Sequence, residues 1–368
     1  MEFFASTTKP LLIDLFAGCG GFSLGAHRAG FHVTTAFDND PILSSSFEFN
    51  FPSTRHELRD VSGLRGDDLR TVAGGSVDGI FGGPPCQGFS DIGRRDRSDP
   101  RRRLLAHFYR LVAETGPTFF VMENVRGLAY RNARDELEGA LTYVRDDYAL
   151  FGPTILDAAD FGAATARPRL FVVGVRKDRG DAILPEDIEA AKRPAATVRD
   201  AIGDLEGVIE VGERDGFDVW RIPDLAPTSD YARRLRAPDR LFTSHRTTAH
   251  APNVVERFAR VEPGGKDEVG RHPRLRWDGQ CPTLRAGTGS DRGSYQSVRP
   301  IHPDYPRVIT VREAARLQGF PDSHLFHPTV WHSFRMIGNS VSPIISEALF
   351  RVIAEKLYGE RVPTAAFV

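Results

Sequence analysis

The stretch LLIDLFAGCGGFSLGAHRAG, residues 11–30, carries the strongest information on the fold. Its first six residues are an apolar run suited to a buried strand, and Gly18, Gly20 and Gly21 then allow a tight turn into the helix-like segment 22–30. A strand that turns over glycines into a helix presents the free N–H groups of the helix N-terminus to a ligand. A nicotinamide enzyme or plain tight packing would give the same local pattern. The stretch predicts the first strand–helix unit of an α/β sheet.

Strand-like and helix-like segments alternate along the first half of the chain. Four further apolar runs indicate buried strands: HVTTAF (32–37), VDGIFG (77–82), TFFVMEN (118–124) and RLFVVGV (169–175). Helical patterns lie between some of them, at HFYRLVAETG (107–116) and ARDELEGALTYVRD (133–146). This alternation is typical of a parallel sheet covered by helices on both faces, so we predict an α/β fold.

The composition and the periodicity of the sequence change after about residue 190. From there to residue 331 the chain is rich in Arg, Pro, Gly and Asp with weak periodicity, which indicates a smaller, loop-rich domain. A last helical segment, SPIISEALFRVIAEKLYG (342–359), follows. We therefore expect a larger domain formed by residues 1–190 and completed by 332–368, and a second domain formed by 191–331.

Composition excludes several classes of protein. The three cysteines are odd in number and widely spaced, so they encode neither a disulfide framework nor a metal site, and no metal is expected. The sequence shows no signal peptide and no run of about 18 apolar residues, so we expect a cytoplasmic protein without a membrane segment. The net charge of -1 neither favours nor excludes a polyanionic partner, because electrostatic fields act locally.

Asp38 indicates the kind of ligand that the glycine turn binds. It ends the second predicted strand, about 20 residues after the turn, where an acidic side chain can accept hydrogen bonds from ribose hydroxyls. We therefore predict a nucleoside ligand at this edge of the sheet.

Cys86 lies in the turn GGPPCQGFS (82–90), directly after a predicted strand. This position is at the carboxyl edge of the sheet, where ligands of open α/β sheets bind. The proline pair restricts the backbone, so the thiol could be held in one direction. A cysteine buried as a small apolar side chain is an equally good reading of this stretch.

Glu123 follows a second apolar strand at the same edge. A partly desolvated carboxyl group there could have a raised pKa and donate a proton, although a loop acid or a helix cap is the alternative. Cys86 and Glu123 together suggest a nucleophile and an acid.

Six ordered motifs carry a family resemblance. DLFAGCGGFS, GGPPCQGFS, MENV, FGAATARPRLFVVGVR, ITVREAARLQGFPDS and IGNSVSP are similar in order and spacing to the principal motifs of DNA (cytosine-5) methyltransferases. The match covers about residues 11–350 except a variable stretch at 206–307. The resemblance implies a Rossmann-like, S-adenosylmethionine-dependent methyltransferase sheet with a smaller target-recognition domain.

The resemblance also implies a covalent mechanism. Cys86 would add to carbon 6 of cytosine as a thiolate, so that carbon 5 can take the methyl group of S-adenosylmethionine. A thiol with a pKa near about 8.5 is only slightly ionised at neutral pH, so nearby positive charge or activation of the base must help. Glu123 would hold or protonate ring N3, and Arg167 and Arg169 would neutralise a phosphate and hold the cytosine O2.

The resemblance also implies which residues of this chain bind the cofactor. The residues that the resemblance implies around S-adenosylmethionine are Phe16, Ala17, Gly18, Cys19, Gly20, Gly21, Phe22, Asp38, Asn39, Asp60, Val61, Pro85, Leu104, Asn339, Ser340 and Val341. For Asp60 an ordinary turn before a helix is a strong alternative.

Two short departures from the family pattern affect these assignments. Ala164 and Thr165 replace the usual Pro-Gln pair, and Ser342 replaces a proline in the last motif. The two arginines after Ala164 and Thr165 keep their spacing. The change at Ser342 affects the rigidity of the loop more than binding.

Double-stranded DNA is the implied partner. A base inside a duplex must be rotated out before it can be modified, and the opened duplex must then be held. The arginine-rich segment RRDRSDPRRR (94–103) and the variable region are suited to phosphates and base edges. The predicted DNA contacts are Gln87, Ser90, Arg94, Arg95, Arg97, Arg101, Arg102, Arg103, Thr283, Leu284 and Arg285.

Two rival functions stay open at this point. A transfer-RNA cytosine-5 methyltransferase would share the chemistry, but its relatives usually have Pro-Phe-Thr where this chain has Gly88, Phe89 and Ser90. A non-enzymatic DNA-binding regulator is disfavoured because only about ten residues precede the first strand, too few for an N-terminal helix-turn-helix. We expect a monomer that is either an orphan enzyme or a member of a restriction-modification system, with a separately encoded restriction endonuclease as its functional partner in the second case.

Overall fold

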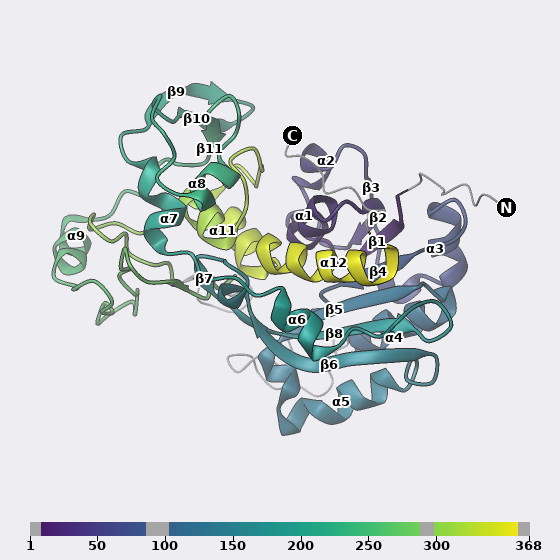
Figure 1. The fold of residues 1–368 in the computed structure, drawn as a ribbon. Helices are drawn as coiled ribbons and strands as arrows, with labels where there is room; N and C mark the ends of the chain where they lie inside the picture. The colour runs from purple at the N-terminus through teal and green to yellow at the C-terminus, as the bar shows by residue number, and fades with distance from the viewer. Residues whose placement is uncertain (1–8, 86–102, 288–297, 360–368) are drawn as a thin grey trace.

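The computed structural model describes residues 9–85, 103–287 and 298–359. Its central element is a seven-stranded sheet with the strand order β3-β2-β1-β4-β5-β8-β6 (Figure 1). Its strands are β1 (Leu11–Leu15), β2 (His32–Asp38), β3 (Arg55–Leu58), β4 (Gly79–Gly82), β5 (Phe119–Val125), β6 (Tyr148–Asp157) and β8 (Pro168–Arg176). The strands β1 to β5 pair in parallel. The predicted α/β class is confirmed.

β8 differs from the prediction because it pairs antiparallel with both β5 and β6. A parallel arrangement was expected for all the predicted strands, and an apolar run alone does not encode strand direction. The pattern also missed β3 and β6. β3 is short and polar, and β6 is interrupted by Gly152 and Pro153, where its pairing with β8 shifts register.

Helices cover both faces of this sheet. One face packs on α1 (Gly21–Arg28), α6 (Pro185–Ala190) and α12 (Pro343–Tyr358), and the other on α3 (Gly66–Val72), α4 (Arg103–Thr115) and α5 (Arg131–Leu141). In α4 the residues Leu105, Phe108, Leu111 and Val112 recur at helical spacing and are fully buried or nearly so. The apolar stripe of the helix therefore faces the core.

The last helix, α12, packs against α1 although the two are far apart in the sequence (Figure 1). An ideal Cβ at Gly25 would lie 2.1 Å from the Ser346 Oγ, so the two helices approach too closely for any side chain there. The Ser346 hydroxyl donates to the Phe22 carbonyl at 2.7 Å. α12 is thus fixed on the helix that follows the glycine turn.

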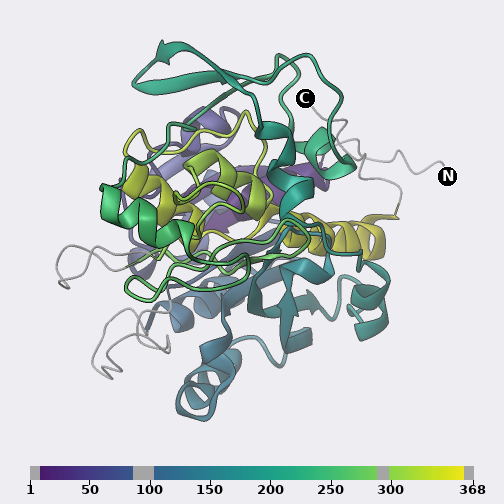
Figure 2. The same cartoon turned by 90° about the vertical axis from the view of Figure 1, so that its left-hand side faces the viewer.

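The chain after residue 190 builds a separate group of short elements, which lies above the blue segments of the sheet in Figure 2. It contains an antiparallel sheet of β9 (Ile209–Arg214), β10 (Phe217–Arg221) and β11 (Leu241–Thr243). Its helices are α7 (Val198–Ile202), α8 (Asp230–Leu235), α9 (Pro252–Ala259), α10 (Val311–Gln318) and α11 (Val330–Asn339). The short strands β7 (Thr165–Ala166) and β12 (Cys281–Pro282) pair with each other.

The remaining elements are single turns: α2 (Phe47–Asn50), η1 (Val61–Gly63), η3 (Arg126–Ala129), η4 (Ala158–Asp160) and η5 (Gly203–Leu205). Among the described residues, no helix combines the length and the apolar character needed to cross a membrane. The division into 1–190 with 332–368 and 191–331 stays a prediction.

A buried ionic cluster joins several of the later elements. The Arg316 guanidinium is fully buried and binds Asp204 at 2.6 Å and Asp322 at 2.7 Å. Arg236 binds the other oxygen of Asp204 at 2.7 Å. Because a buried charge is costly unless it is paired, these contacts fix α10 against η5 and the end of α8.

Candidate active site

The turn between β1 and α1 has a backbone that only particular residues allow. Gly18 and Gly20 have φ values of 53° and 82°, and an ideal Cβ at Gly20 would lie 2.1 Å from the Phe51 ring. An ideal Cβ at Gly21 would lie 1.9 Å from the Ser340 Oγ and 2.4 Å from the Val341 carbonyl oxygen. The glycine turn and the segment after α11, both predicted cofactor sites, are therefore in direct contact.

Phe16 begins this turn with a φ of 69°, in the left-handed region that non-glycine residues rarely adopt. Strained backbone of this kind is concentrated at functional sites. No sequence pattern predicted this strain, because an apolar run that ends in phenylalanine is typical of an ordinary strand.

Asp38 closes the turn from the neighbouring strand. Its carboxylate accepts hydrogen bonds from the N–H groups of Gly18 at 2.7 Å and Asp40 at 2.8 Å. Burial raises the pKa of Asp38, although these hydrogen bonds oppose the shift. Asn39 is exposed beside it. An acceptor is thus held at the end of β2, as a ribose-binding residue requires.

Asp14 is a further carboxyl group that sequence analysis missed. It lies in the middle of β1 and accepts a 2.5 Å hydrogen bond from the Ser23 hydroxyl of α1. Burial raises the pKa of Asp14 well above its ordinary value. An acidic residue within the apolar run was the available signal. The hydrogen bond joins β1 to α1 beneath the glycine turn.

Asp60 and Val61 lie at the start of η1. The Asp60 side chain is exposed and accepts a 2.8 Å hydrogen bond from the Ser62 N–H, so it caps this turn. That hydrogen bond lowers the pKa of Asp60. Val61 is buried, whereas Pro85 and Leu104 are half-buried. Capping is the alternative that the sequence left open for Asp60, and it does not prevent a cofactor contact.

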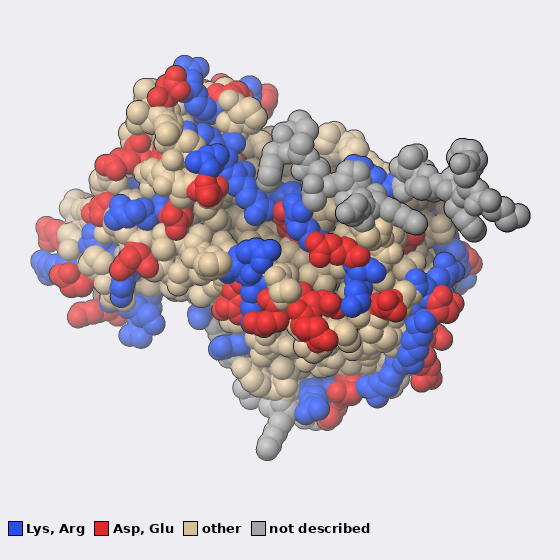
Figure 3. Space-filling model, in the orientation of Figure 1, with Lys and Arg blue, Asp and Glu red and all other residues tan. Residues whose placement is uncertain are grey.

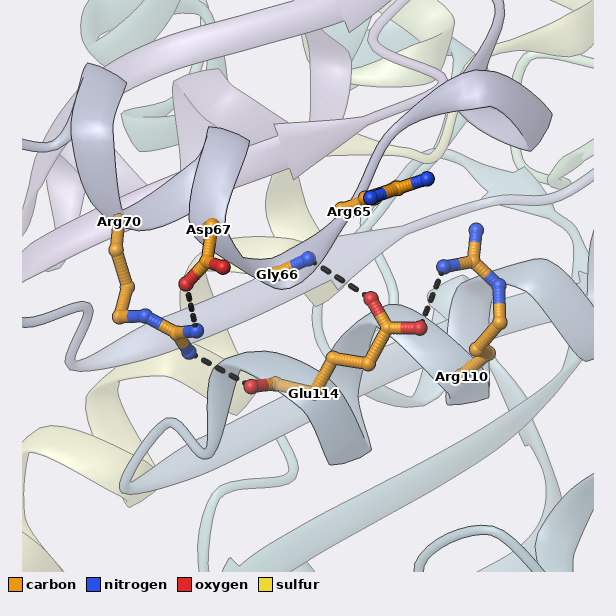
Figure 4. A pocket seen from close by; sticks show the side chains of 6 residues that line it. All are labelled: Arg65, Gly66, Asp67, Arg70, Arg110 and Glu114. Carbon is orange, nitrogen blue, oxygen red and sulfur yellow. Dashed lines mark hydrogen bonds and ion pairs between the residues drawn. The ribbon is translucent and has the colours of Figure 1, made fainter.

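A surface cavity of about 370 Å³ lies beside η1, between the start of α3 and the end of α4 (Figure 4). Its Glu114 accepts hydrogen bonds from Arg110 at 2.7 Å and from the Gly66 N–H at 2.8 Å. Arg110 also donates to the Leu64 carbonyl at 2.9 Å. The polar groups of the cavity therefore bind one another and hold the segment that follows η1.

Glu123 lies against the residues that lead to Cys86. An ideal Cβ at Gly83 would lie 3.2 Å from the Glu123 Oε2, and the neighbouring Asn124 amide donates to the Pro84 carbonyl at 3.0 Å. Both side chains are buried. The end of β5 thus fixes the two positions that come two and three residues before Cys86.

Arg169 pairs with Glu123. The distance from Arg169 Nε to Glu123 Oε1 is 3.1 Å, and the two side chains are 15% and 10% exposed. Burial raises the pKa of Glu123, while the charges of Arg169 and Arg167 oppose that rise. The carboxyl group remains easier to protonate than an ordinary glutamate.

Arg167 has a different environment from Arg169. It is only 2% exposed, and its guanidinium donates to the carbonyls of Leu284, Gly338 and Ser340 at 3.1, 2.8 and 2.6 Å. It therefore ties the start of β8 to the segment after α11 and to the chain after β12. This geometry favours a structural role for Arg167 over a phosphate contact.

Cys86 itself lies outside the described residues, and the other two cysteines are buried. The Cys19 thiol points to the Met336 carbonyl, 3.6 Å away, and burial raises its pKa to about 12. Burial also raises the pKa of Cys281. Neither thiol is suited to nucleophilic attack, because the thiolate is the reactive form.

The predicted DNA contacts are only partly described. Thr283 donates from its hydroxyl to the Ala166 carbonyl at 2.7 Å, and Leu284 is buried in an apolar cluster with α10 and α11. These two residues hold the segment in place, whereas Arg285 and Arg103 are exposed. Outside the described residues lie Gln87, Ser90, Arg94, Arg95, Arg97, Arg101 and Arg102.

The described residues on the face that carries α12 form no uniformly basic surface. Figure 3 shows Lys and Arg side chains interspersed there with Asp and Glu side chains. Such a mixed field does not attract a polyanion as a uniformly basic face would.

The residues present fit S-adenosylmethionine. Gly18 leaves open space where a Cβ would stand, the N-terminus of α1 follows it, and the Asp38 carboxylate lies beside the turn. A glycine turn, a helix N-terminus and an acidic acceptor match the methionine and ribose parts of that molecule. Next to this region, the paired Glu123 and Arg169 could hold a polar ring and move a proton.

Comparisons with known proteins identify the family of this chain. Residues 11–355 match the family described as C-5 cytosine-specific DNA methylase. The Type II methyltransferase M.XorII of Xanthomonas oryzae is 41% identical over 93% of this chain and 84% of its own length. The Type II methyltransferase M.DdeI of Desulfomicrobium norvegicum is 35% identical over 92% of this chain and 87% of its own length.

Solved structures show the same similarity. An Escherichia coli protein described as a DNA modification methyltransferase encoded within a prophage has a TM-score of 0.82 and 38% identity, over 95% of this chain and 99% of its own. The Dnmt2 methyltransferase of S. pombe has a TM-score of 0.64 at 20% identity, over 95% of this chain and 100% of its own, and shows the fold alone.

Proposed function

Because the chain belongs to the family of C-5 cytosine-specific DNA methylases, we propose that it methylates a cytosine of a specific duplex sequence through a covalent adduct between Cys86 and carbon 6. Family membership makes it a DNA (cytosine-5)-methyltransferase, an enzyme that moves a methyl group from S-adenosylmethionine to cytosine in DNA.

The environment of Glu123 is the main observation that supports this proposal. Its carboxyl group is buried, paired with Arg169 and packed against Gly83, three residues before Cys86. If Cys86 on that turn attacks the cytosine ring, the Glu123 carboxyl group would be within reach of the polar edge of the same ring. A buried carboxyl group whose pKa is raised is suited to donate a proton, which supports this role for Glu123.

The chemistry follows from the reactivity of cytosine. Carbon 5 is a poor nucleophile, so the Cys86 thiolate first forms a bond to carbon 6 and the ring becomes an enamine. Glu123 holds or protonates N3 and draws electrons away as sulfur attacks. S-adenosylmethionine supplies the methyl group that carbon 5 accepts. A water molecule acting as base then takes the carbon-5 proton, and the electrons of that bond re-form the double bond to carbon 6 and expel Cys86 as a thiolate. N3 returns its proton to Glu123, which restores the aromatic ring.

The other predicted residues support this reaction. Arg169 would hold the cytosine O2 while it keeps Glu123 in place, and Arg167 would keep the start of β8 at the site through its three carbonyl contacts. The glycine turn, Asp38 and Asn39, Asp60 and Val61, Pro85 and Leu104, and Asn339 to Val341 would hold the cofactor.

DNA must be opened for this chemistry. The target cytosine would be rotated out of the duplex, and the arginine-rich segment 94–103 together with residues 283–285 would hold the remaining strand. The relatives M.XorII and M.DdeI are named Type II methyltransferases. We extend this name to a role in a restriction-modification system, as a cytoplasmic monomer with a separately encoded endonuclease.

A methyl-transfer assay tests the proposal. Purified protein and radiolabelled S-adenosylmethionine are incubated with duplex DNA, with transfer RNA and without nucleic acid, and bisulfite sequencing then maps the methylated plasmid. We expect label in duplex DNA at cytosines of one sequence. Label in transfer RNA alone, or in neither nucleic acid, would reject the proposed substrate.

A further inference from the structure

Among the described residues, none compensates the charge of Arg299. Its guanidinium carbon lies 4.2 Å from the centre of the Phe334 ring of α11. Within residues 9–85, 103–287 and 298–359, neither an acidic side chain nor a hydrogen-bond acceptor contacts this guanidinium. The side chain is half-buried, and burial lowers the pKa of Arg299.

Two other arginines that lie over aromatic rings in the same part of the chain are paired. Arg307, which lies over a tyrosine ring, binds Glu313 through hydrogen bonds of 2.8 and 2.9 Å. Arg257, which lies over a phenylalanine ring, binds Asp267 at 2.5 Å. A ring offsets only part of the hydration that a cation loses, and no described residue accepts a hydrogen bond from the five N–H donors of Arg299.

The position of Arg299 links it to residues 283–285. Phe334 and Gly338 lie one turn apart on α11, and an ideal Cβ at Gly338 would lie 2.4 Å from the Ala286 backbone nitrogen. The segment that follows Arg285 therefore packs on the same helix as Arg299. Arg285 is itself exposed at this place.

The same helix leads to the active site. Arg167 bridges the carbonyls of Leu284, Gly338 and Ser340, and it precedes Arg169, the partner of Glu123, by two residues. Arg299 therefore contacts α11 at Phe334, one turn before Gly338, whose carbonyl binds Arg167.

We propose that Arg299 binds a backbone phosphate of the DNA substrate, with the Phe334 ring holding its guanidinium in place. This inference rests on the proposed function, because the ligand is the strand that carries the target cytosine. A phosphate matches a planar guanidinium through two parallel hydrogen bonds, and it supplies the counter-charge that the described residues lack. The contact is independent of sequence, as phosphate contacts are.

The salt dependence of DNA binding tests this contact. Affinity for a short mixed-sequence duplex is measured over a range of KCl concentrations for the wild type, Arg299→Met and Arg299→Lys. Methionine keeps an apolar stem over Phe334, whereas lysine keeps the charge. We expect Arg299→Met to flatten the slope of log K against log salt by about 0.9 and to weaken binding roughly tenfold at low salt. Arg299→Lys should keep the wild-type slope.

Arg199→Met is the matched control. Arg199 also lies over an aromatic ring, 4.9 Å from the centre of Trp277, but it is exposed. Its replacement should leave the slope unchanged. Equal unfolding free energies and equal S-adenosylhomocysteine affinities of wild type and Arg299→Met would show that the fold is intact.

The outcomes separate this inference from the proposed function. A wild-type protein that methylates duplex DNA, together with an unchanged slope for Arg299→Met, overturns the phosphate contact alone. A wild-type protein that neither binds nor methylates duplex DNA overturns the proposed function as well. A flattened slope in Arg299→Met and not in Arg199→Met supports the contact.

Discussion

Arg169 and Glu123 are diagonal neighbours on one face of the antiparallel pair β5–β8, with 3.1 Å between Nε and Oε1. Arg169 pairs with Val125, two residues after Glu123, so both side chains point to the same side. Because β8 is antiparallel to β5, its first residues lie at the carboxyl edge of the parallel strands. A parallel β8 would place Arg169 at the opposite edge of the sheet.

Glu123→Gln should lower turnover by roughly 10²-fold or more, the usual contribution of a positioned acid. The amide fills the same space but cannot deliver a proton. Binding of S-adenosylmethionine should stay similar, because Glu123 is not among the predicted cofactor contacts. Steady-state kinetics and calorimetry measure the two effects, and Glu355→Gln, on the exposed side of α12, is the control. Turnover near that of the wild type would remove Glu123 from the mechanism.

Arg169→Met should move the alkaline limb of the pH–rate profile to higher pH. Burial raises the pKa of Glu123 and the charge of Arg169 opposes that rise, so its removal raises the pKa further. A group that must donate a proton then stays protonated to higher pH, although the maximal rate falls as the contact to O2 is lost. The profile of kcat/KM from pH 6 to about 10 measures the shift. An unmoved limb would assign that ionisation to another group.

The sequence predicted most of the fold but not the direction of β8. Strongly apolar runs identified β1, β2, β4, β5 and β8, whereas β3 and β6 lack a clean pattern because one is short and polar and the other is interrupted by Gly152 and Pro153. Strand direction depends on how distant segments pack, and periodicity does not record that. The role of Arg169 at the cytosine came from family resemblance and was inconsistent with a parallel strand at residues 169–175, which would begin at the opposite edge of the sheet.

The site itself was predictable only where a motif names the residue. The glycine turn, Asp38 and Glu123 follow from strand ends and spacing. The strain at Phe16 and the carbonyl contacts of Arg167 depend on atoms that lie far apart in the sequence. His324 is a similar case. It is buried after α10, and its Nε2 lies 3.0 Å from the Cys19 carbonyl oxygen.

His324→Phe should weaken S-adenosylmethionine binding roughly tenfold while kcat at saturating cofactor changes little. Burial lowers the pKa of His324 to about 3, so the neutral ring donates its Nε2 proton to the carbonyl of the glycine turn. Loss of that donor leaves a buried carbonyl unpaired and loosens the turn. His327→Asn, three residues further along, is the control. A fall in kcat with unchanged cofactor affinity would contradict a role in the turn.

Glu313→Gln should destabilise the protein by roughly 3 kcal/mol at pH 7. Burial alone would raise the pKa of Glu313, but hydrogen bonds from Arg307 and the charges around it lower the value to about 2. A lowered pKa contributes stability that is complete above about pH 5 and is lost as the pH falls towards 2. The difference from wild type in urea unfolding should therefore be constant from pH 8 to about 5.5 and shrink below that. A difference independent of pH down to about 3 would exclude an electrostatic origin, and Glu256→Gln, an exposed position on α9, should show none.

Cys86 should form an adduct that 5-fluorocytosine traps. If its thiolate adds to carbon 6, release requires departure of the carbon-5 substituent as a proton, and fluorine at that carbon blocks this step after methyl transfer. Duplexes with 5-fluorocytosine at the target should therefore give a denaturation-resistant protein–DNA species that requires S-adenosylmethionine. Gel electrophoresis under denaturing conditions detects it.

The cysteine variants decide which thiol reacts. Cys86→Ala should not form the trapped species, whereas Cys19→Ala and Cys281→Ala should, since both of these thiols are buried with raised pKa values and point into the protein core. The three positions account for all the cysteines of the chain, so the comparison is complete. A species that persists in Cys86→Ala, or that mass spectrometry assigns to another residue, would mean that the proline-framed turn beside Glu123 supports the site without supplying its nucleophile.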